Sequence, residues 1–405
     1  MSDRLMPFRP AEMLLPDRSV APETWACVAC DQYTSQPKYW EEVKNVVGTA
    51  PSALKIVFPE VYLSEGEERI SAINAEMNNY IENGIFKEYK DILIYVERTQ
   101  GDGRVRRGIL GTVDLEEYDF SKTSKSLIRA TEGTVLERIP PRVKIRENAP
   151  LELPHILLLL NDEKDEIIKK PENCEKLYDF ELMQGGGHIR GYKIADGQAD
   201  RIIEKINERA KTARGNLLFA VGDGNHSLAT AKTCWENIKK TLSEEEKKNH
   251  PARFCLVEIE NIHQEAIEFE PIHRVVFGVN PQKIIDEIKA FYPETFEKEN
   301  GGAHVRYVYG NVEGDLYIKN SGCLLAVGAL QKFLDSKDFK IDYIHGDKTA
   351  AELAKNENNI AFLLPKPDKN DLFDGVIKDG ALPRKTFSMG EADDKRFYIE
   401  AKKIK

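Results

Sequence analysis

The stretch Leu217–Leu228, which reads LLFAVGDGNHSL, contains the transitions that decide the fold class. Residues 217–221 are apolar and have the length and composition of a buried β-strand. The polar run 222–226 ends that strand, and apolar residues then recur at helical spacing from Leu228 to Ile238. The sequence therefore predicts a strand, a tight loop and a helix, in this order.

The loop between this strand and this helix suits an anionic ligand. Gly222 and Gly224 allow the backbone to come very close to a bound molecule. The first N–H groups of a helix lack intrahelical partners and carry partial positive charge, which favours phosphate or carboxylate. His226 falls in the first helical turn, where the dipole favours a neutral imidazole that can accept a proton. The same residues also fit an ordinary turn in which Asn225 only caps the helix.

Length and charge limit the class of protein. The chain has 405 residues, which is enough for two or three domains with a large core. Its 58 basic and 68 acidic residues are not gathered into long blocks, which argues against a nucleic acid partner. The N-terminus lacks a signal-peptide pattern, and no apolar run approaches the ~18 residues of a membrane span. We therefore expect a cytoplasmic protein without a membrane partner.

The cysteines indicate neither a disulfide framework nor a metal centre. Six cysteines are few for this length. Cys27 and Cys30 have the spacing of a redox or metal-binding pair, but a zinc site would need a second pair and the sequence contains none. No metal-ligating residue is predicted.

Helical and strand patterns alternate along the chain and predict an α/β (α+β) fold, with a mixed sheet core and flanking helices. Apolar residues with a 3.6-residue period between 67 and 89 predict a helix packed on a sheet. The pattern restarts after Gly278, which predicts a core region at 1–278 and a smaller α/β lobe at 279–405, whose C-terminal tail returns to the core. Strands are expected at 56–58, 92–96, 105–113, 155–160, 254–259, 305–309, 316–318, 324–327 and 341–344.

Two polar segments of the core region are further candidates for anion binding. Arg129 suits an anionic group and Glu132 suits a base, although an exposed ion pair explains both residues as well. The glycine-rich loop 185–191 contains His188 and Arg190, whose N–H groups are donors for an anion. A mobile surface loop is the alternative interpretation of that segment.

The C-terminal part contains two more candidate segments. His273 and Arg274 stand at the mouth of an apolar strand, where they either serve a ligand or face solvent. Residues 341–349 again read as a strand, a glycine turn and a helix, with Lys348 adding a cation in the first helical turn. Asp347 as a plain N-cap is the alternative.

Several segments together resemble the DUF1015 family, a family of unknown function, over nearly the whole chain. In that family the central motif is commonly Asp-Gly-His-His-Arg. Asp223, Gly224 and His226 fit it here, whereas Asn225 and Ser227 replace the first His and the Arg. The segments that carry the resemblance are 8–10, 128–132, 222–227, 271–276 and 383–387.

The central motif also resembles the phosphate-side loop of the ParB and sulfiredoxin-like superfamily, which includes nucleotide-dependent free-serine kinases. This resemblance implies a phosphoryl-handling site and a place in serine metabolism. We expect a phosphotransferase or phosphatase that acts on a small hydroxy or amino acid such as serine or phosphoserine. Its ligand would be a small phosphorylated molecule or a nucleotide, with Mg²⁺ and ADP or ATP as cofactors. The alternative is a non-catalytic nucleotide or metabolite sensor built on the same loops.

Residue roles follow from these patterns. The expected catalytic residues are Asp223 for metal or proton handling, His226 as the acid/base and Glu132 as an alternative base. The expected substrate- and phosphate-binding residues are Gly222, Gly224, Asn225, Ser227, Arg129, His188, Arg190, His273, Arg274 and Lys348.

Overall fold

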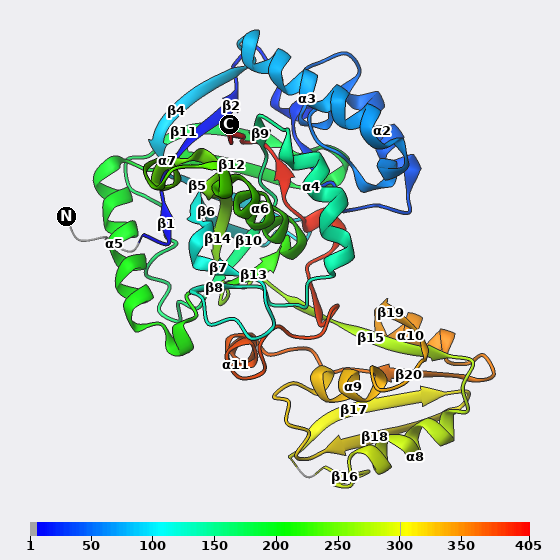
Figure 1. Ribbon diagram of the computed structural model, residues 1–405. Helices are drawn as coiled ribbons and strands as arrows, with labels where there is room; N and C mark the ends of the chain where they lie inside the picture. Colours follow the sequence, from blue (N-terminus) through cyan, green and yellow to red (C-terminus); the bar gives the residue numbers. More distant parts are fainter. Residues whose placement is uncertain (1–5, 300) are drawn as a thin grey trace.

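The structure is a computed structural model that describes residues 6–299 and 301–405. Its larger body is built on a mixed sheet flanked by helices, which confirms the predicted α/β class (Figure 1). In spatial order, the strands of this first sheet are β11 (Glu175–Glu181), β12 (His188–Lys193), β5 (Ile94–Thr99), β6 (Val105–Asp114), β14 (Phe254–Asn261), β10 (Leu157–Leu160), β13 (Phe219–Asp223), β8 (Ile128–Arg129) and β7 (Tyr118–Asp119), with β1 (Phe8–Arg9) beside β6.

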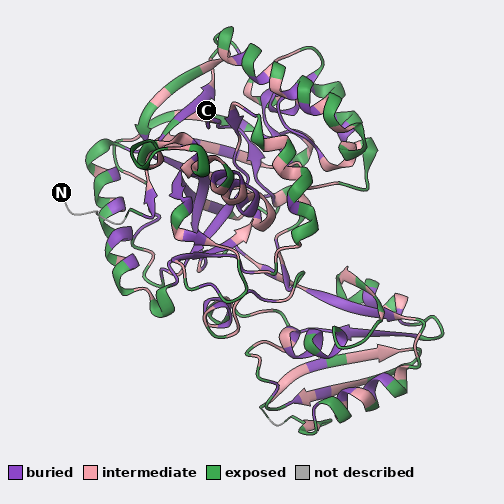
Figure 2. Cartoon of the chain, viewed as in Figure 1, coloured by how far each residue is buried: buried purple, intermediate pink, exposed green. Residues whose placement is uncertain are grey.

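Helices cover both faces of the first sheet. The leucines of β10 alternate between the faces, as every second residue of a strand must. Leu157 and Leu159 pack with α11 (Lys369–Asp379), and the other two leucines pack with α5 (Asp196–Thr212) and α6 (Asn225–Ile238). A strand that is buried on both faces is apolar throughout, and the buried strands at the centre of Figure 2 show this core.

Strand direction decides which loops meet at one end of the first sheet. β13 runs parallel to β8, so the residues that follow these two strands lie at the same end. β10 runs antiparallel to β13, with Leu157 opposite Asp223, so the residues that precede β10 lie at this end too. Segments 130–135, 154–156 and 222–227 are thereby brought together.

A second sheet forms the smaller lobe. The apolar pattern restarts after Gly278 because α8 (Pro281–Phe291) begins there. The first strand of the second sheet, however, is β15 (Phe269–Phe277), which lies before Gly278. That strand pairs with β19 and β20, which are distant in sequence, and a local pattern does not show such pairing. The order is β16 (Thr295–Phe296), β18 (Val312–Ile318), β17 (Ala303–Tyr309), β20 (Asn359–Leu363), β15 (Phe269–Phe277) and β19 (Lys340–His345), with β21 (Phe387–Met389) also paired to β15.

The last residues of the chain run back along the larger body. β22 (Phe397–Tyr398) pairs with β3 (Cys27–Val28), so the C-terminal tail forms a short ribbon with an early segment of the chain. β23 (Lys402–Lys403) pairs with β9 (Leu151–Glu152). The remaining elements are β2 (Ala11–Pro16), β4 (Phe86–Ile92), α1 (Pro22–Trp25), α2 (Pro37–Val47), α3 (Gly66–Glu82), α4 (Ile139–Glu147), α7 (Glu244–Asn249), α9 (Ala326–Leu334) and α10 (Asp347–Leu353).

Two of the expected strands form other structures. Residues 56–58 follow a short 3-10 helix, Ala53–Lys55, and are buried without joining a sheet. Residues 324–327 overlap the start of α9, which packs on the second sheet. Both runs are apolar, although Leu324 is 37% exposed, and a short apolar run does not by itself distinguish a strand from another kind of segment. Within the described residues, no helix has both the length and the apolar character needed to cross a membrane.

Candidate functional site

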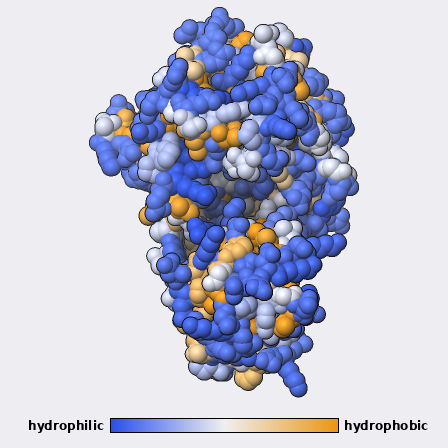
Figure 3. All heavy atoms as spheres, turned by 90° about the vertical axis from the view of Figure 1, so that its right-hand side faces the viewer, coloured by the Kyte–Doolittle hydropathy of each residue, from blue (hydrophilic) through white to orange (hydrophobic). Residues whose placement is uncertain are grey.

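A cavity of about 780 Å³ lies where β13 gives way to α6. Its walls come from the loop 222–227, from α4 and from the residues before β10, and the smaller lobe adds Tyr343 and His345. Figure 3 shows this region as a hollow between the larger body and the smaller lobe. The predicted site residues that line it are Glu132, Gly222, Asp223, Gly224, Asn225, His226 and Ser227.

The first turn of α6 opens onto this cavity without a side-chain cap. Gly224 occupies the N-cap position with φ of 80°, in the left-handed region that glycine adopts without steric cost. The side chain of Asn225 does not cap the helix. It accepts the Thr131 N–H at 3.2 Å and donates to the Thr131 hydroxyl at 3.3 Å. The first N–H groups of α6 are therefore left for a ligand or for solvent.

His226 lies beside these N–H groups as a neutral imidazole. Its Nε2 accepts a hydrogen bond from the Val135 N–H at 3.3 Å, which places the ring proton on Nδ1. Burial, reinforced by the charges of Arg142 and Arg138, lowers the pKa of His226 from 6.5 to about 4. At neutral pH the ring thus presents an N–H donor rather than a free lone pair.

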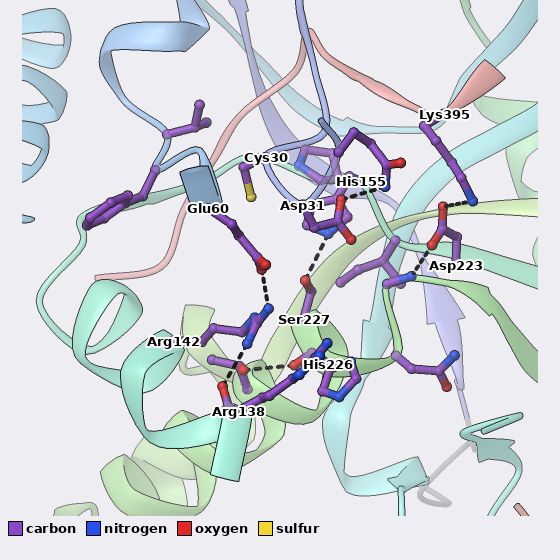
Figure 4. Close-up of a pocket in the computed structure, with 18 of the residues that line it drawn as sticks. Cys30, Asp31, Glu60, Arg138, Arg142, His155, Asp223, His226, Ser227 and Lys395 are labelled. Carbon is purple, nitrogen blue, oxygen red and sulfur yellow. Dashed lines mark hydrogen bonds and ion pairs between the residues drawn. The ribbon is translucent and has the colours of Figure 1, made fainter. Parts of the chain in front are cut away.

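Asp223 is held by two partners. Its Oδ1 accepts the Gly224 N–H at 2.9 Å, and its Oδ2 pairs with the Lys395 ammonium at 3.1 Å (Figure 4). The part of the chain that the structure describes contains no group of three or more His, Cys, Asp or Glu side chains placed to hold a metal ion. Each oxygen of Asp223 keeps a further lone pair, but no group of carboxylates is placed beside it among residues 6–299 and 301–405, so this donor set is not a preformed Mg²⁺ site.

Glu132 fixes the turn at Lys385, which follows α11 in the chain. Its carboxylate accepts the N–H groups of Lys385 and Thr386, each at 3.0 Å. From the other side, the buried guanidinium of Arg274 donates to the carbonyls of Arg384 and Lys385 at 3.1 and 2.9 Å. Lys385 has φ of 57°, a conformation that costs energy for a non-glycine residue. We call Glu132 and Arg274 the clamp, because together they hold this strained turn against the cavity.

Ser227 and His155 form a hydrogen-bonded pair on the cavity wall (Figure 4). Ser227 Oγ lies 2.8 Å from His155 Nε2, and His155 Nδ1 lies 2.8 Å from the Tyr398 hydroxyl. That hydroxyl accepts the Cys30 N–H at 3.2 Å and donates to the Cys30 thiol at 3.0 Å. Strand pairing brings these residues together, because His155 precedes β10, Ser227 follows β13 and Tyr398 lies on β22 beside β3.

Cations gather on the same side of the cavity as the first turn of α6. Arg142 forms an ion pair with Glu60, whereas no carboxylate of residues 6–299 and 301–405 pairs with Arg138 or Lys385. All three cations line the cavity, and all three lower the pKa of His226. The wall next to α6 therefore carries two cations without a direct ion-pair partner, which favours an anionic ligand.

Arg129 does not reach the cavity, contrary to the expectation from sequence. It lies on β8 next to β13, but its buried guanidinium donates to the carbonyls of Ser126 and Gly215. Gly215 precedes β13, so this side chain points toward the end of the strand opposite the loop 222–227. Its role is to satisfy the carbonyls of two loops.

His188 and Arg190 are also remote from the cavity. They lie on β12, which four strands separate from β13. His188 bonds Asp179 at 2.6 Å and Glu181 at 2.7 Å, and Arg190 pairs with Asp179 at 3.2 Å. Burial favours the neutral ring of His188, but these carboxylates raise its pKa above the ordinary value. The glycines 185–187 form the turn between β11 and β12 and do not hold a ligand-binding loop at the cavity.

The candidates in the smaller lobe have structural partners as well. His273 bonds Asp347 at 2.9 Å and accepts the Leu364 N–H at 3.1 Å. Arg274 belongs to the clamp, and its guanidinium serves backbone carbonyls. Lys348 is exposed on α10 and is not part of the cavity wall. None of these three residues contacts the cavity.

Several residues that line the cavity were not predicted as site residues from the sequence. Arginines at 138, 142 and 146 recur every fourth residue, which puts them on one face of α4, and this spacing is a signal that could have found them. His155 was visible only as the polar start of an apolar run. No local signal marks the tail residues Lys395 and Tyr398, because their position depends on the pairing of β22 with β3.

A family model described as "Protein of unknown function (DUF1015)" matches residues 8–372. The chain belongs to the DUF1015 family. The match confirms the resemblance carried by the segments around the central motif. A search of curated proteins finds no match to this DUF1015 protein.

Solved structures that this DUF1015 protein resembles have low sequence identity to it. A free serine kinase in complex with AMP has 12% identity and a TM-score of 0.41, covering 73% of this chain and 92% of that chain. SbnI with a C-terminal truncation, from Staphylococcus aureus, has 11% identity and a TM-score of 0.37, covering 69% of this chain and 82% of that chain. A conserved hypothetical protein from Pyrococcus furiosus has 14% identity and a TM-score of 0.37, covering 74% of this chain and 95% of that chain.

Proposed function

We propose that the cavity binds a phosphorylated small molecule or a nucleotide, with a phosphate at the first turn of α6. The observation that carries this proposal is the uncapped start of α6, which opens onto a cavity edged by the unpaired cations Arg138 and Lys385. Helix N-termini bind phosphate through unpaired N–H groups and the helix dipole. The cavity volume of about 780 Å³ lies in the range of small-molecule sites.

The state of His226 supports the same ligand. The positive charges that help to lower its pKa are the charges that attract an anion. With its proton on Nδ1, the neutral ring offers a directional N–H donor beside the first turn of α6.

We further propose that the protein is a phosphotransferase or phosphatase that acts on a small hydroxy or amino acid such as serine or phosphoserine. Phosphoryl transfer requires mainly positioning and neutralisation of charge, and N–H donors and cations for both lie around one cavity. The likeness of the motif 222–227 to that of nucleotide-dependent free-serine kinases supports ADP or ATP as the phosphoryl donor. Mg²⁺ would enter with the nucleotide phosphates, since the described residues form no preformed group of three or more His, Cys, Asp or Glu ligands for it.

A nucleotide or metabolite sensor is the second candidate function. It is favoured by the state of the three expected catalytic side chains, Asp223, His226 and Glu132, whose acceptor atoms are engaged by protein partners. A binding protein needs only the donors and cations of the cavity and no free general base.

Calorimetry and thermal melting test the binding proposal, with inorganic phosphate, phosphoserine, ADP and ATP as probes. We expect at least one of these compounds to raise the melting temperature. Arg138→Ala and Lys385→Ala should each weaken binding by about 10- to 100-fold, as the loss of a charged hydrogen bond does. Lys348→Ala is the matched control, because Lys348 is exposed and outside the cavity wall, and it should bind as the wild type does. Failure of all four compounds to bind would refute the proposal.

Turnover separates the enzyme from the sensor. We expect either phosphate release from phosphoserine or phosphoryl transfer from ADP or ATP to serine. Asp223→Asn should lower that activity, because it removes the carboxylate charge that pairs with Lys395 at the cavity. Binding without product in both assays would favour the sensor, and equal turnover by wild type and Asp223→Asn would exclude a role of Asp223 in the chemistry.

A further inference from the structure

Ser227 and His155 have the geometry of a nucleophile and its general base. The 2.8 Å between Ser227 Oγ and His155 Nε2 falls within the range of such pairs, about 2.6–3.2 Å. Both residues line the cavity, and Figure 4 shows the serine hydroxyl directed at the imidazole. His155 is 7% exposed, so the protein rather than bulk water surrounds the ring.

Tyr398 contacts His155 on the side of the ring away from Ser227. The phenol oxygen accepts the Cys30 N–H and lies 2.8 Å from His155 Nδ1. Burial raises the pKa of Tyr398 well above its ordinary value, so the phenol keeps its proton. In the tautomer whose proton is on Nδ1 and is donated to the phenol oxygen, the lone pair of Nε2 faces the Ser227 hydroxyl. This is the tautomer that a base requires.

A carboxylate lies close to the same ring. Asp31 is drawn beside His155 in Figure 4, and its backbone follows β3 next to Tyr398. Burial opposes the ionisation of Asp31, but attraction to the imidazolium form of His155, the charge of Lys395 and a hydrogen bond from Gln32 bring its pKa below the ordinary value. A charged Asp31 stabilises the imidazolium that forms when His155 takes a proton.

Ser227 also lies where the proposed phosphate would bind. It is in the first turn of α6, among the N–H groups that face the cavity. Asp223, His226 and Glu132 have their acceptor atoms engaged elsewhere, whereas the Ser227 hydroxyl meets a lone pair that can take its proton.

We propose that Ser227 is the nucleophile of this site, that His155 is its general base, and that a phosphorylated substrate passes its phosphoryl group to Ser227 as a transient phosphoserine. The identity of the substrate rests on the proposed function; the reactivity of the serine does not. Ser227 Oγ forms a bond to phosphorus, its proton passes to His155 Nε2, and the bond from phosphorus to the leaving oxygen breaks. His155 then protonates that oxygen. In the second half, water gives a proton to His155 and attacks phosphorus, and Ser227 Oγ leaves with the proton restored, releasing inorganic phosphate.

Diisopropyl fluorophosphate is the probe that tests the pair directly. It phosphorylates an activated serine as fluoride leaves, so its reaction needs the nucleophile and base but no recognised substrate. We expect intact-mass spectrometry of the full-length protein to show one added diisopropylphosphoryl group, and peptide mapping to place it on Ser227. Ser227→Ala should abolish the label. His155→Gln should slow labelling by about 100-fold or more, as expected for the loss of a general base.

Ser388 supplies the matched control. It also lines the cavity, but its hydroxyl donates to the Gly390 carbonyl at 3.0 Å and has no imidazole partner. Ser388→Ala should be labelled on Ser227 at the wild-type rate. Tyr398→Phe tests the positioning role, because loss of the phenol oxygen should shift the pH dependence of labelling and not only its rate. Melting curves of every variant establish that it is folded.

The outcomes separate this inference from the proposed function. An unlabelled wild-type protein, or a Ser227→Ala variant labelled as fast as the wild type, overturns the assignment of Ser227. Binding of phosphoserine or a nucleotide without labelling of Ser227 would support the proposed ligand and refute only the assignment of Ser227 as the nucleophile. Labelling of Ser227 without binding of any phosphorylated compound would support Ser227 as the nucleophile and refute the proposed ligand.

Discussion

His226 is kept neutral by two effects that act in the same direction. The ring is largely withdrawn from water, and Arg142 and Arg138 oppose the arrival of a further positive charge. A charged ring would bring another cation to the wall but would lose the lone pair that accepts the Val135 N–H. The neutral state therefore preserves the hydrogen bond that orients the donor at Nδ1.

We expect the free energy of unfolding to fall as the pH decreases from 6.5 toward 4, and His226→Gln to reduce this dependence. Between these values the unfolded chain binds a proton on His226 that the folded protein does not bind, so acid favours unfolding. Urea unfolding at neutral pH and at pH 5 measures the effect. An equal loss of stability in wild type and variant would contradict the assignment.

His188→Gln is the control of opposite sign. Burial opposes protonation of His188, but Asp179 and Glu181 raise its pKa, so the folded protein binds this proton more tightly than the unfolded chain. The stability that this proton contributes is present at low pH and is lost as the pH rises through the folded-state pKa. The variant should therefore lose stability at pH 5 and little at pH 8.

At the residue scale, the sequence predicts a candidate site at the loop 222–227 because the chemistry of that loop is local, and the structure places the loop on the cavity wall. Adjacent glycines, an aspartate and a histidine at a helix start can be read without knowledge of the fold. Arg129 and Arg274 could not be placed in this way. Their guanidinium groups serve carbonyls 86 and 111 residues away, and a long side chain gives no sign of its partner.

The start of α6 is the element on which the cavity depends. Gly224 takes the left-handed conformation that turns the chain from β13 into the helix, and its position beside Ile156 leaves little room for a side chain. A Cβ at Gly224 would lie 3.0 Å from the Ile156 backbone. Glycine here thus serves both the turn and the close packing of the loop on the residues before β10.

Gly224→Ala should lower the free energy of unfolding by about 1–2 kcal/mol, the cost of the left-handed conformation for a residue with a Cβ. It should also weaken phosphate binding, because the first turn of α6 must shift. Gly48→Ala is the matched control, since Gly48 has φ of 54° and open space around a new Cβ. The control should lose stability but bind as the wild type does. Urea unfolding and calorimetry measure the two effects, and unchanged binding by Gly224→Ala would contradict the role of this turn.

At the element scale, long periodic segments were predictable and short apolar runs were not. The 3.6-residue period between 67 and 89 corresponds to α3, and the strand expected at 105–113 corresponds to β6. Residues 56–58 and 324–327 are as apolar as strands, but residues 56–58 are buried in a loop and Val327 is buried in α9, each against elements far along the chain.

The C-terminal tail forms a buried ion pair with the first sheet. Arg396 is 2% exposed and pairs with Glu258 of the first sheet and with Glu400 farther along the tail, each at 2.8 Å. Buried charges of this kind need all their partners, because an unpaired charge cannot be solvated.

Arg396→Ala should lower the free energy of unfolding by about 3–5 kcal/mol, the cost of leaving buried carboxylates uncompensated. Arg190→Ala removes an ion pair in which the arginine side chain is 40% exposed, and should cost about 0–1 kcal/mol. Chemical denaturation of both variants gives the comparison. Similar losses in the two would show that burial of the Arg396 pairs contributes little.

At the scale of the whole molecule, the class of fold could be predicted from the sequence, but the connections between its elements could not. Alternating patterns predicted a mixed sheet with helices, which the structure contains. The assignment of β15 to the second sheet and the return of β22 to β3 depend on pairing across more than 60 and 360 residues. His155 and Tyr398 meet Ser227 only through such pairing, which is why that cluster had no local signature.

The clamp couples ligand occupancy to the mechanics of the molecule. Glu132 belongs to the larger body and Arg274 to the smaller lobe, so the backbone of Lys385 stays in place only while the two bodies keep their spacing. If the proposed anion binds Lys385, it stabilises the arrangement in which the two bodies keep this spacing. Because such coupling is reciprocal, a change that separates the two bodies lowers the affinity for the anion. The same coupling free energy then measures both how far the anion stabilises the spacing of the two bodies and how far that spacing strengthens anion binding.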